Sequence, residues 1–214
     1  MMSSSRRFVG FAIAWSATFC FSMIGSAQEE LTPTVVVSGL NNPTGVAIQP
    51  DTGTVFIAES GAGRIVRLRE DGNSVEPVVV GFPEDAYGKG PTYKIGPLSM
   101  AFRDKTTLVI GGGGRPDGDE TIYVVAVPEV GSDPVNVESA KTFGPLAATE
   151  AKGETPAVPG EGNFFNVAIV DDFVYATSNG DDEKGWIARG VFEKNDPKGP
   201  LERFIATKPF VQVN

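Results

Sequence analysis

Short apolar runs separated by polar turn residues fill residues 39–207. The runs are five to eight residues long and rich in Val, Ile, Phe and Thr, and Gly, Pro, Asp and Asn stand between them. No long stretch keeps the 3.6-residue spacing of an amphipathic helix. Such runs are typical of short β-strands joined by turns, so the sequence predicts an all-β protein.

The predicted strands form three groups of four, and the loops between them vary more in length than the strands do. The first group is residues 44–48, 54–58, 64–68 and 75–80. The second group is residues 98–102, 107–111, 121–127 and 135–142. The third group is residues 165–170, 173–177, 186–192 and 201–207. A four-stranded unit that recurs along the chain predicts a repeat architecture.

The first strand of each group carries an alanine one residue before an apolar residue. These are Ala47, Ala101 and Ala168, in PTGVAI, PLSMAF and FFNVAI, and they are 54 and 67 residues apart. A four-stranded unit with a small residue in its first strand is typical of a β-propeller blade, whose inner strand lies near the crowded axis of the ring. An irregular β-sandwich with chance similarity between its strands is the alternative.

The clearest version of the repeat is GLNNPTGVAIQPDTGTVFIAESGAGRIVRLREDG, residues 39–72. It contains Pro-Thr-Gly at 43–45, Pro-Asp-Thr-Gly at 50–53 and Ala-Glu-Ser at 58–60. This segment resembles an NHL-type repeat and the blades of six-bladed TolB-like and SMP-30/gluconolactonase-like propellers. The resemblance weakens to the strand pattern alone in the next two groups. It implies a fold more than a function, because such propellers host many activities.

We expect a partial propeller that spans residues 28–214. Its blades are expected at about residues 39–80, 93–142 and 161–207. Three blades are fewer than the four to eight of closed propellers. Residues 31–38 (LTPTVVVS) are expected to form a lone outer strand ahead of the first blade. An open ring exposes sheet edges and a core face, which favours association. The sequence therefore fits a fragment of a longer chain, a homodimer that closes the ring, or an unstable product, and we favour the fragment.

The first 27 residues have the three parts of a secretory signal peptide. Arg6 and Arg7 precede an apolar run at residues 8–24, and small residues follow at 25–27. The run is too short for a membrane span, and the residues before Cys20 lack the small side chains of a lipoprotein site. We therefore expect a secreted or periplasmic protein of a bacterial envelope, with no membrane span after cleavage.

Composition limits the chemistry that the folded part can perform. The chain has no histidine and a net charge of −9, which becomes −11 without Arg6 and Arg7. The missing histidine excludes Ser-His-Asp and Cys-His catalysis and histidine-ligated zinc. The acidic balance argues against nucleic acid as a partner, because phosphates bind Lys and Arg. Cys20 is the only cysteine, so the mature fold must be stabilised by its core and not by disulfides.

Long connections of the predicted propeller gather on one face, where the loops between second and third strands meet the connections between blades. Two of these loops are acidic, and carboxylates spaced by a glycine suit a hard cation such as Ca²⁺. The candidate metal ligands are Asp117, Asp119, Glu120, Asn179, Asp181 and Asp182. Solvated acidic turns are the alternative, because Asp, Asn and Gly are good turn formers.

Two other stretches allow a functional interpretation and a structural one. GGGGRPDGD, from residue 111, lacks the Lys-Ser/Thr and the helix of a phosphate-binding loop, so we expect a flexible turn between strands. Phe164, Phe165 and Trp186 could form an aromatic platform for a ligand, and packing between blades is the commoner explanation.

Two functions remain open from the sequence. The first is an exported, non-catalytic propeller segment that binds a partner or ligand through its long-loop face. This function is favoured, because the sequence shows no complete catalytic set. The second is a metal-dependent hydrolase of the lactonase type, which the family resemblance and the acidic loops imply. The cofactor of such an enzyme would be a divalent cation such as Ca²⁺, whereas the substrate and the partner stay unidentified.

Overall fold

The computed structural model describes residues 32–88, 90–116, 118–147, 163–178 and 185–206. The chain divides into two units, Met1–Thr34 and Val35–Asn214, and all strands named below belong to the second unit. In the part of the chain that is described, no helix is long and apolar enough to cross a bilayer.

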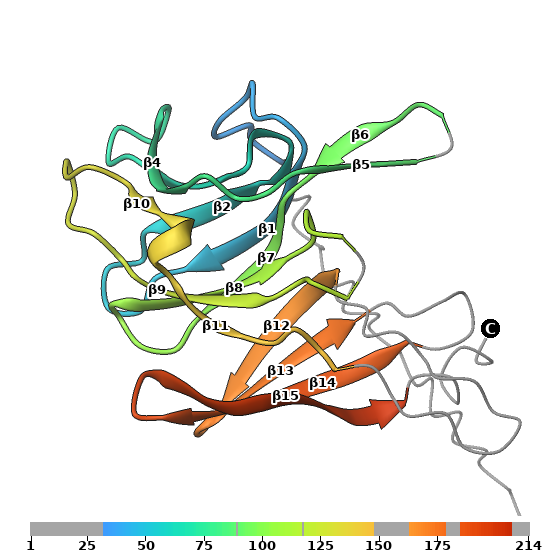
Figure 1. Cartoon of the computed structure of the whole chain (residues 1–214). Helices are drawn as coiled ribbons and strands as arrows, with labels where there is room; N and C mark the ends of the chain where they lie inside the picture. Colours follow the sequence, from blue (N-terminus) through green and yellow to red (C-terminus); the bar gives the residue numbers. More distant parts are fainter. Residues whose placement is uncertain (1–31, 89, 117, 148–162, 179–184, 207–214) are drawn as a thin grey trace, which may run out of the picture. The chain divides into compact units, whose positions relative to one another are not determined.

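Three sheets of antiparallel strands follow one another along the chain, and each forms one blade (Figure 1). Blade 1 contains β1 (Pro43–Ile48), β2 (Val55–Glu59), β3 (Arg64–Leu68) and β4 (Val75–Val80). Blade 2 contains β7 (Pro97–Phe102), β8 (Thr107–Gly112), β9 (Ile122–Ala126) and β11 (Lys141–Phe143). Blade 3 contains β12 (Phe164–Val170), β13 (Phe173–Ser178), β14 (Trp186–Glu193) and β15 (Asp196–Ala206). The all-β, four-stranded blade architecture expected from the sequence is confirmed.

The outer strand of blade 2 differs from the expectation. The prediction of a single strand over residues 135–142 is wrong. The segment splits into β10 (Val135–Asn136), the short 3₁₀ helix η2 (Val137–Ser139) and β11. β10 pairs in parallel with β4 and thereby joins the sheet of blade 1. The Asn136 side chain accepts a hydrogen bond from the Glu138 amide, 2.9 Å. This cap ends β10 and starts η2, so the strand cannot continue.

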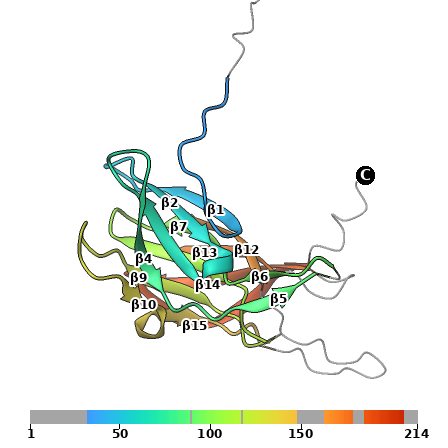
Figure 2. The same ribbon diagram turned by 90° about the horizontal axis from the view of Figure 1, so that it is seen from above.

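Two further expectations about single elements also fail. Residues 32–38 form no strand, although residues 31–38 were expected to form one. In contrast, the connection between blades 1 and 2 was expected to be a loop and contains a hairpin of β5 (Asp85–Tyr87) and β6 (Tyr93–Ile95) (Figure 2).

The inner strands of the three blades share one irregularity. The register of β1 shifts between Pro43 and Gly45, that of β7 between Pro97 and Ser99, and that of β12 between Phe164 and Asn166. The alanines then pair at equivalent places, Ala47 with Phe56, Ala101 with Val109 and Ala168 with Tyr175. A β-bulge repeated at the same place shows that the three sheets are copies of one unit.

Each blade has a front face, defined here as the face on which its inner-strand alanine lies, and an opposite back face. The front of blade 1 packs against the back of blade 2 in one core, which includes Phe56, Ile65, Met100, Leu108 and Tyr123. The front of blade 2 packs against the back of blade 3 in a second core. That core includes Val109, Val124, Phe143, Val167 and Val174.

Polar side chains at the ends of the inner strands reach forward to the next blade. The Gln49 amide donates to the Lys105 carbonyl, 2.6 Å. At the equivalent position, Arg103 donates to the Asp171 carbonyl, 3.1 Å, and to the Asp172 carboxylate, 2.8 Å. The inner strands also approach closely, because a Cβ on Gly45 would lie only 2.9 Å from the Leu98 carbonyl oxygen. The blades are therefore joined by a repeated contact and not only by apolar packing.

Candidate functional site

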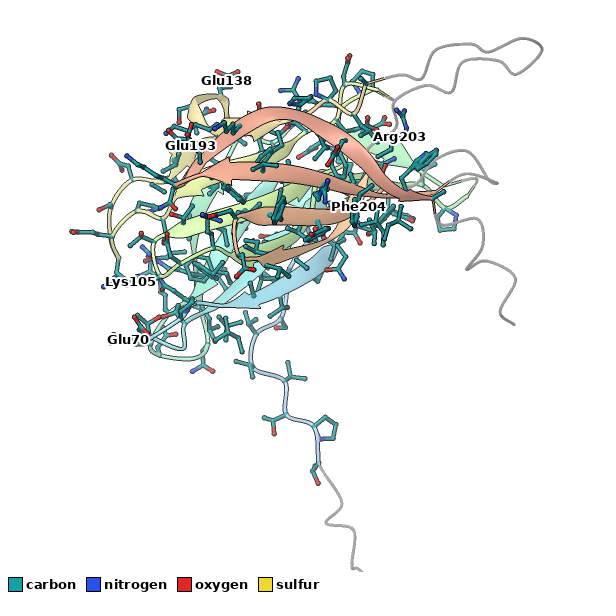
Figure 3. The ribbon with its side chains drawn as sticks, turned by 90° about the horizontal axis from the view of Figure 1, so that it is seen from below. Glu70, Lys105, Glu138, Glu193, Arg203 and Phe204 are labelled. Atoms are coloured by element: carbon teal, nitrogen blue, oxygen red, sulfur yellow. The ribbon has the colours of Figure 1, made fainter. Side chains whose placement is uncertain are left out.

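The connections divide between two ends of the sheets. One end carries short turns, such as residues 103–106 and 171–172. The other end carries η1 (Ser60–Ala62), the β5–β6 hairpin, the glycine-rich loop after β8, and the starts of the inner strands. Glu70, Lys105 and Glu193 lie at the short-turn end of their blades, whereas Phe204 and Arg203 lie toward the other end (Figure 3). Long loops on a rigid scaffold commonly carry function, so the second end is the one to search.

A pocket of about 210 Å³ lies at this end, where the three inner strands begin, and we call it the mouth pocket. All three blades and the β5–β6 hairpin contribute to it. Its lining residues are Asn42, Thr44, Tyr93, Ile95, Leu98, Asn163 and Phe165. These side chains carry no formal charge at neutral pH. The pocket therefore suits an uncharged molecule better than an ion.

Aromatic rings form part of the wall of the mouth pocket. Tyr93 and Phe165 are 47% and 53% exposed, whereas Ile95 and Leu98 are buried at its base. The rings come from different parts of the chain, Tyr93 from the hairpin and Phe165 from the bulge of β12. Exposed aromatic rings beside an apolar base can cover the flat face of a ligand.

Polar groups in the pocket wall are held by backbone contacts. The Asn42 side-chain amide donates to the Lys94 carbonyl, 2.9 Å, and the Thr44 hydroxyl donates to the Pro97 carbonyl, 3.1 Å. In both bonds Asn42 and Thr44 act as donors. Their side-chain oxygens can therefore still accept hydrogen bonds from a ligand. The Asn163 Oδ1 atom is buried and has no hydrogen-bond partner among the described residues. The wall of the mouth pocket therefore offers acceptor oxygens at Asn42 and Thr44.

A layer of buried polar residues holds the pocket wall from below. Glu59 is 2% exposed. Its carboxylate accepts hydrogen bonds from the Arg64 side chain, 2.7 Å, and from the backbone amide of Asn41, 2.8 Å. The Ser60 hydroxyl accepts from the Gly96 amide, 2.8 Å. These contacts tie the segment before β1 and the segment before β7 to the end of β2. The Ala-Glu-Ser motif of the first blade thus positions the mouth of the pocket.

The predicted metal ligands are not brought together within the described residues. Asp117, Asn179, Asp181 and Asp182 lie outside them. Glu120 is buried, and its carboxylate accepts from the Gly118 amide, 2.8 Å, while Asp119 beside it is exposed. No group of three or more Asp, Glu, Cys or His side chains that could hold a metal occurs in the described part. The Ca²⁺ site therefore stays a prediction.

The glycine-rich loop differs from the flexible turn expected from the sequence. Gly111 to Gly114 are buried. A Cβ on Gly114 would lie 1.9 Å from the Pro83 carbonyl oxygen, and one on Gly113 would lie 2.3 Å from the Leu98 side chain. The run of glycines lets this loop pack against the neighbouring backbone. Close packing thus explains why glycines stand here, and a phosphate-binding role is not needed to explain them.

The aromatic residues singled out in the sequence have separate roles. Phe164 is completely buried between blades 2 and 3, and Phe165 lines the mouth pocket. Trp186 is partly buried, and the Arg203 guanidinium carbon lies 5.4 Å from its ring centroid. Only one residue of the proposed aromatic platform therefore lines the pocket. Tyr93, from the β5–β6 hairpin, is the second aromatic residue in the wall of the mouth pocket.

Larger cavities lie elsewhere and are less suited to a ligand. One, about 440 Å³, lies along the outer strands of blade 2 beside the turn between β14 and β15, where Lys141 and Asp196 form an ion pair. Another, about 320 Å³, lies beside Arg67 and Glu76, whose charges are already paired with each other. Both cavities are lined by charged side chains and by no aromatic ring, in contrast to the mouth pocket.

The comparisons with known proteins add little. No protein-family model and no curated protein matches the sequence. Among solved structures, one similar chain is the PQQ-bound form of aldose sugar dehydrogenase from Streptomyces coelicolor. It is 13% identical, the similarity covers 81% of this chain and 84% of that chain, and the TM-score is 0.41. The NHL-type and SMP-30-like resemblance therefore stays a prediction, and the propeller architecture rests on the repeated blades described above.

Proposed function

We propose that this protein is a propeller-type binding protein that takes a small, uncharged ligand in the mouth pocket. The observation that carries the proposal is the convergence of three blades and one hairpin on a pocket without charged side chains. At about 210 Å³, this pocket is smaller than the roughly 300–1,000 Å³ of sites for drug-sized ligands. The ligand, or the part of it that enters, is therefore small.

The chemistry of the wall narrows the ligand class further. Tyr93 and Phe165 offer apolar ring faces, so the ligand has an apolar face of its own. Asn42 and Thr44 offer oxygen acceptors, so the ligand carries hydroxyl or amide donors. A cyclic molecule with several hydroxyl groups satisfies both requirements, because its C–H face stacks on a ring while its edge donates hydrogen bonds.

A non-catalytic role agrees with the residues that are present. The chain contains no histidine, and the pocket lining contains no Asp, Glu, Lys or Cys. General acid–base and nucleophilic catalysis draw on such groups. The described wall of the mouth pocket therefore supplies mainly recognition groups, and Tyr93 and Thr44 carry its only hydroxyls.

Isothermal titration with a panel of neutral ring compounds tests the proposal. The probes are D-glucose, myo-inositol and uridine, with D-gluconate as the charged comparison. We expect saturable binding of at least one neutral probe and none of D-gluconate. Tyr93→Ala and Phe165→Ala should each weaken that binding by about tenfold or more, because each removes a stacking surface.

Val130→Ala is the matched control, because Val130 is 78% exposed and lies in the turn after β9, away from the mouth pocket. It should leave the affinity unchanged. If no neutral probe binds, or if the two aromatic variants bind as well as the parent, the mouth pocket is not the ligand site.

We also propose that the protein is exported. Support comes only from the sequence, in which Arg6 and Arg7 precede an apolar run and small residues at 25–27. Expression of the full sequence in a Gram-negative host, followed by N-terminal sequencing of the periplasmic fraction, tests this. Export predicts a mature chain that starts near Gln28. Recovery of the uncleaved chain from the cytoplasm would contradict it.

A further inference from the structure

The front face of blade 3 is uncovered, although the front faces of blades 1 and 2 are both buried by the next blade. Val170 and Phe204 on this face are 55% and 44% exposed. Tyr175, at the position that Phe56 occupies in blade 1, is partly exposed, whereas Phe56 is completely buried. A shallow hollow of about 170 Å³ lies on the same face, beside Ala168. The third copy of a repeated interface thus lacks its partner within the described chain.

Arg189 and Glu202 identify what kind of partner this face takes. In blade 1, strand pairing aligns Ala47, Phe56, Arg67 and Glu76. In blade 3, the same pairing aligns Ala168, Tyr175, Arg189 and Glu202. The two Arg–Glu pairs are therefore the same feature in two copies of the repeat.

The blade 1 pair is completed by the next blade. Arg67 donates to the Pro128 carbonyl, 2.8 Å, and to the Glu129 carbonyl, 2.6 Å, in the turn after the third strand of blade 2. In blade 2 the cation lies one strand farther out. Lys141 pairs across the sheet with Val124, the residue equivalent to Arg67, and forms an ion pair with Asp196, which follows the equivalent turn of blade 3. Blades 1 and 2 thus each offer a cation, from the outer half of the front face, to the region of the turn between the third and fourth strands of the blade that follows. In blade 3 that cation is Arg189.

The back face of blade 1 is the complementary open surface. Val46 and Ile48 are each 65% exposed. Their equivalents in blade 2, Met100 and Phe102, pack against the front of blade 1. Ile57 and Val66, farther out on the same face, are already buried, so the open part is β1.

The turn after the third strand of blade 1 is acidic, and this matches Arg189. Glu70 and Asp71 lie there, and both are exposed, whereas the charge of the neighbouring Arg69 is paired with Glu76, 3.4 Å. By the repeat, this turn corresponds to the one in blade 2 that receives Arg67. Opposite charges at equivalent places favour correct docking and disfavour other partners.

We propose that the front face of blade 3 binds blade 1 of a second copy of this chain, and that two copies close one ring. Val170 and Arg189 of one copy would meet β1 and the acidic 69–74 turn of the other, and the same contact would recur on the opposite side. The three described blades of two copies would number six, which lies within the four to eight blades of closed propellers. A single chain carries both halves of its own repeated interface, and this favours a second copy over an unrelated partner.

The test is the solution mass of the protein, expressed from the full sequence, by light scattering over a dilution series. We expect a dimer. Val170→Asp and Val46→Asp should each weaken dimerisation by about tenfold or more, because each buries an unpaired carboxylate in the contact. Both residues are exposed in the single chain, so both variants should keep its circular dichroism spectrum. Val130→Asp, at a residue 78% exposed in blade 2, is the control and should remain dimeric.

Charge reversal tests the predicted register. Arg189→Glu should weaken the dimer, and Glu70→Arg in the same chain should restore it, because the opposite charges then meet again. A monomeric parent, an open-ended assembly, or a dimer that tolerates both Val170→Asp and Arg189→Glu would overturn the proposal. None of these outcomes depends on ligand binding at the mouth pocket, so the two proposals fail separately.

Discussion

Arg67–Glu76 in blade 1 and Arg189–Glu202 in blade 3 occupy the same position in the repeat but have different surroundings. The first pair is covered by blade 2, and its side chains are 5% and 7% exposed. The second pair lies on an open face, with side chains 27% and 50% exposed. In the open pair the guanidinium carbon of Arg189 lies 4.1 Å from the centroid of the Phe204 ring. A neighbouring blade thus converts a surface ion pair into a buried one, and the energetic consequences of that burial can be measured.

The largest expected effect is the loss of Arg67. Arg67→Ala leaves the Glu76 carboxylate buried without its main partner, which should cost about 3–5 kcal/mol of folding free energy. In the Val170→Asp background, where the front face of blade 3 should stay open, Arg189→Ala should cost far less, because water can solvate Glu202 in place of the lost partner. Urea unfolding at one fixed protein concentration measures both. Equal losses in the two variants would show that blade 2 does not bury the first pair as described.

The next largest loss of stability is expected where a side chain is added between the inner strands of two blades. Gly111 and Thr177 are equivalent residues of β8 and β13, since they pair with Ser99 and Asn166. A Cβ on Gly111 would lie 2.3 Å from the Phe164 carbonyl oxygen of the next blade, whereas Thr177 is exposed. Gly111→Ala should therefore cost about 1–3 kcal/mol through overpacking.

Thr177→Ala is the matched change on the front face of blade 3. In the Val170→Asp background, which should keep this face open, it should alter the midpoint of thermal unfolding very little. If Gly111→Ala leaves the free energy of unfolding unchanged, blades 2 and 3 can move apart without loss of stability. This would contradict the close packing of their inner strands.

A smaller effect is expected from one hydrogen bond between blades. The Ser99 hydroxyl donates to the Phe164 carbonyl, 3.0 Å, and Ser99 is buried. Ser99→Ala removes this bond and should cost about 1 kcal/mol. Asn166, its equivalent in blade 3, is exposed in the single chain, so Asn166→Ala should be close to neutral in the Val170→Asp background. A larger loss from Asn166→Ala than from Ser99→Ala would show that the open face is already occupied in solution.

The blades could be predicted from the sequence, because the signals that specify their strands and turns lie in neighbouring residues. Alternating apolar runs and turn residues place β3 and β4 within the predicted limits, and Ala47, Ala101 and Ala168 mark equivalent positions. The parallel pairing of β10 with blade 1 has no such signal. It depends on where a turn brings two residues in space, and propensity alone does not specify this.

The site was harder to predict than the fold for the same reason. Phe164 and Phe165 are identical neighbours in the sequence, and only the bulge of β12 decides that Phe164 enters the core and Phe165 the mouth pocket. A shift of one residue exchanges the two faces of a strand. Similarly, residues 32–38 have strand-like composition and form no strand, because strands need a partner edge as well as propensity.

The smallest expected effect is the pH dependence of the buried pair. Burial raises the pKa of Glu76, but the hydrogen bond and the charge of Arg67 outweigh it, so the pKa falls below its usual 4.5. A carboxylate with a depressed pKa in the folded state stabilises the fold above its unfolded pKa and loses this contribution as the pH falls. The stability gap between the parent and Glu76→Gln should therefore narrow as the pH drops below about 4.5.

Urea unfolding of both proteins at neutral and acidic pH measures this gap. Part of the acid sensitivity will persist in Glu76→Gln, because hydrogen bonds from Thr106 and Thr107 overcome burial and lower the pKa of Asp104 as well. The gap between the two proteins isolates Glu76 from that background. A gap that stays constant into acid would mean that Glu76 does not titrate between the two states, and that the buried pair in blade 1 differs from the open pair in blade 3 by packing alone.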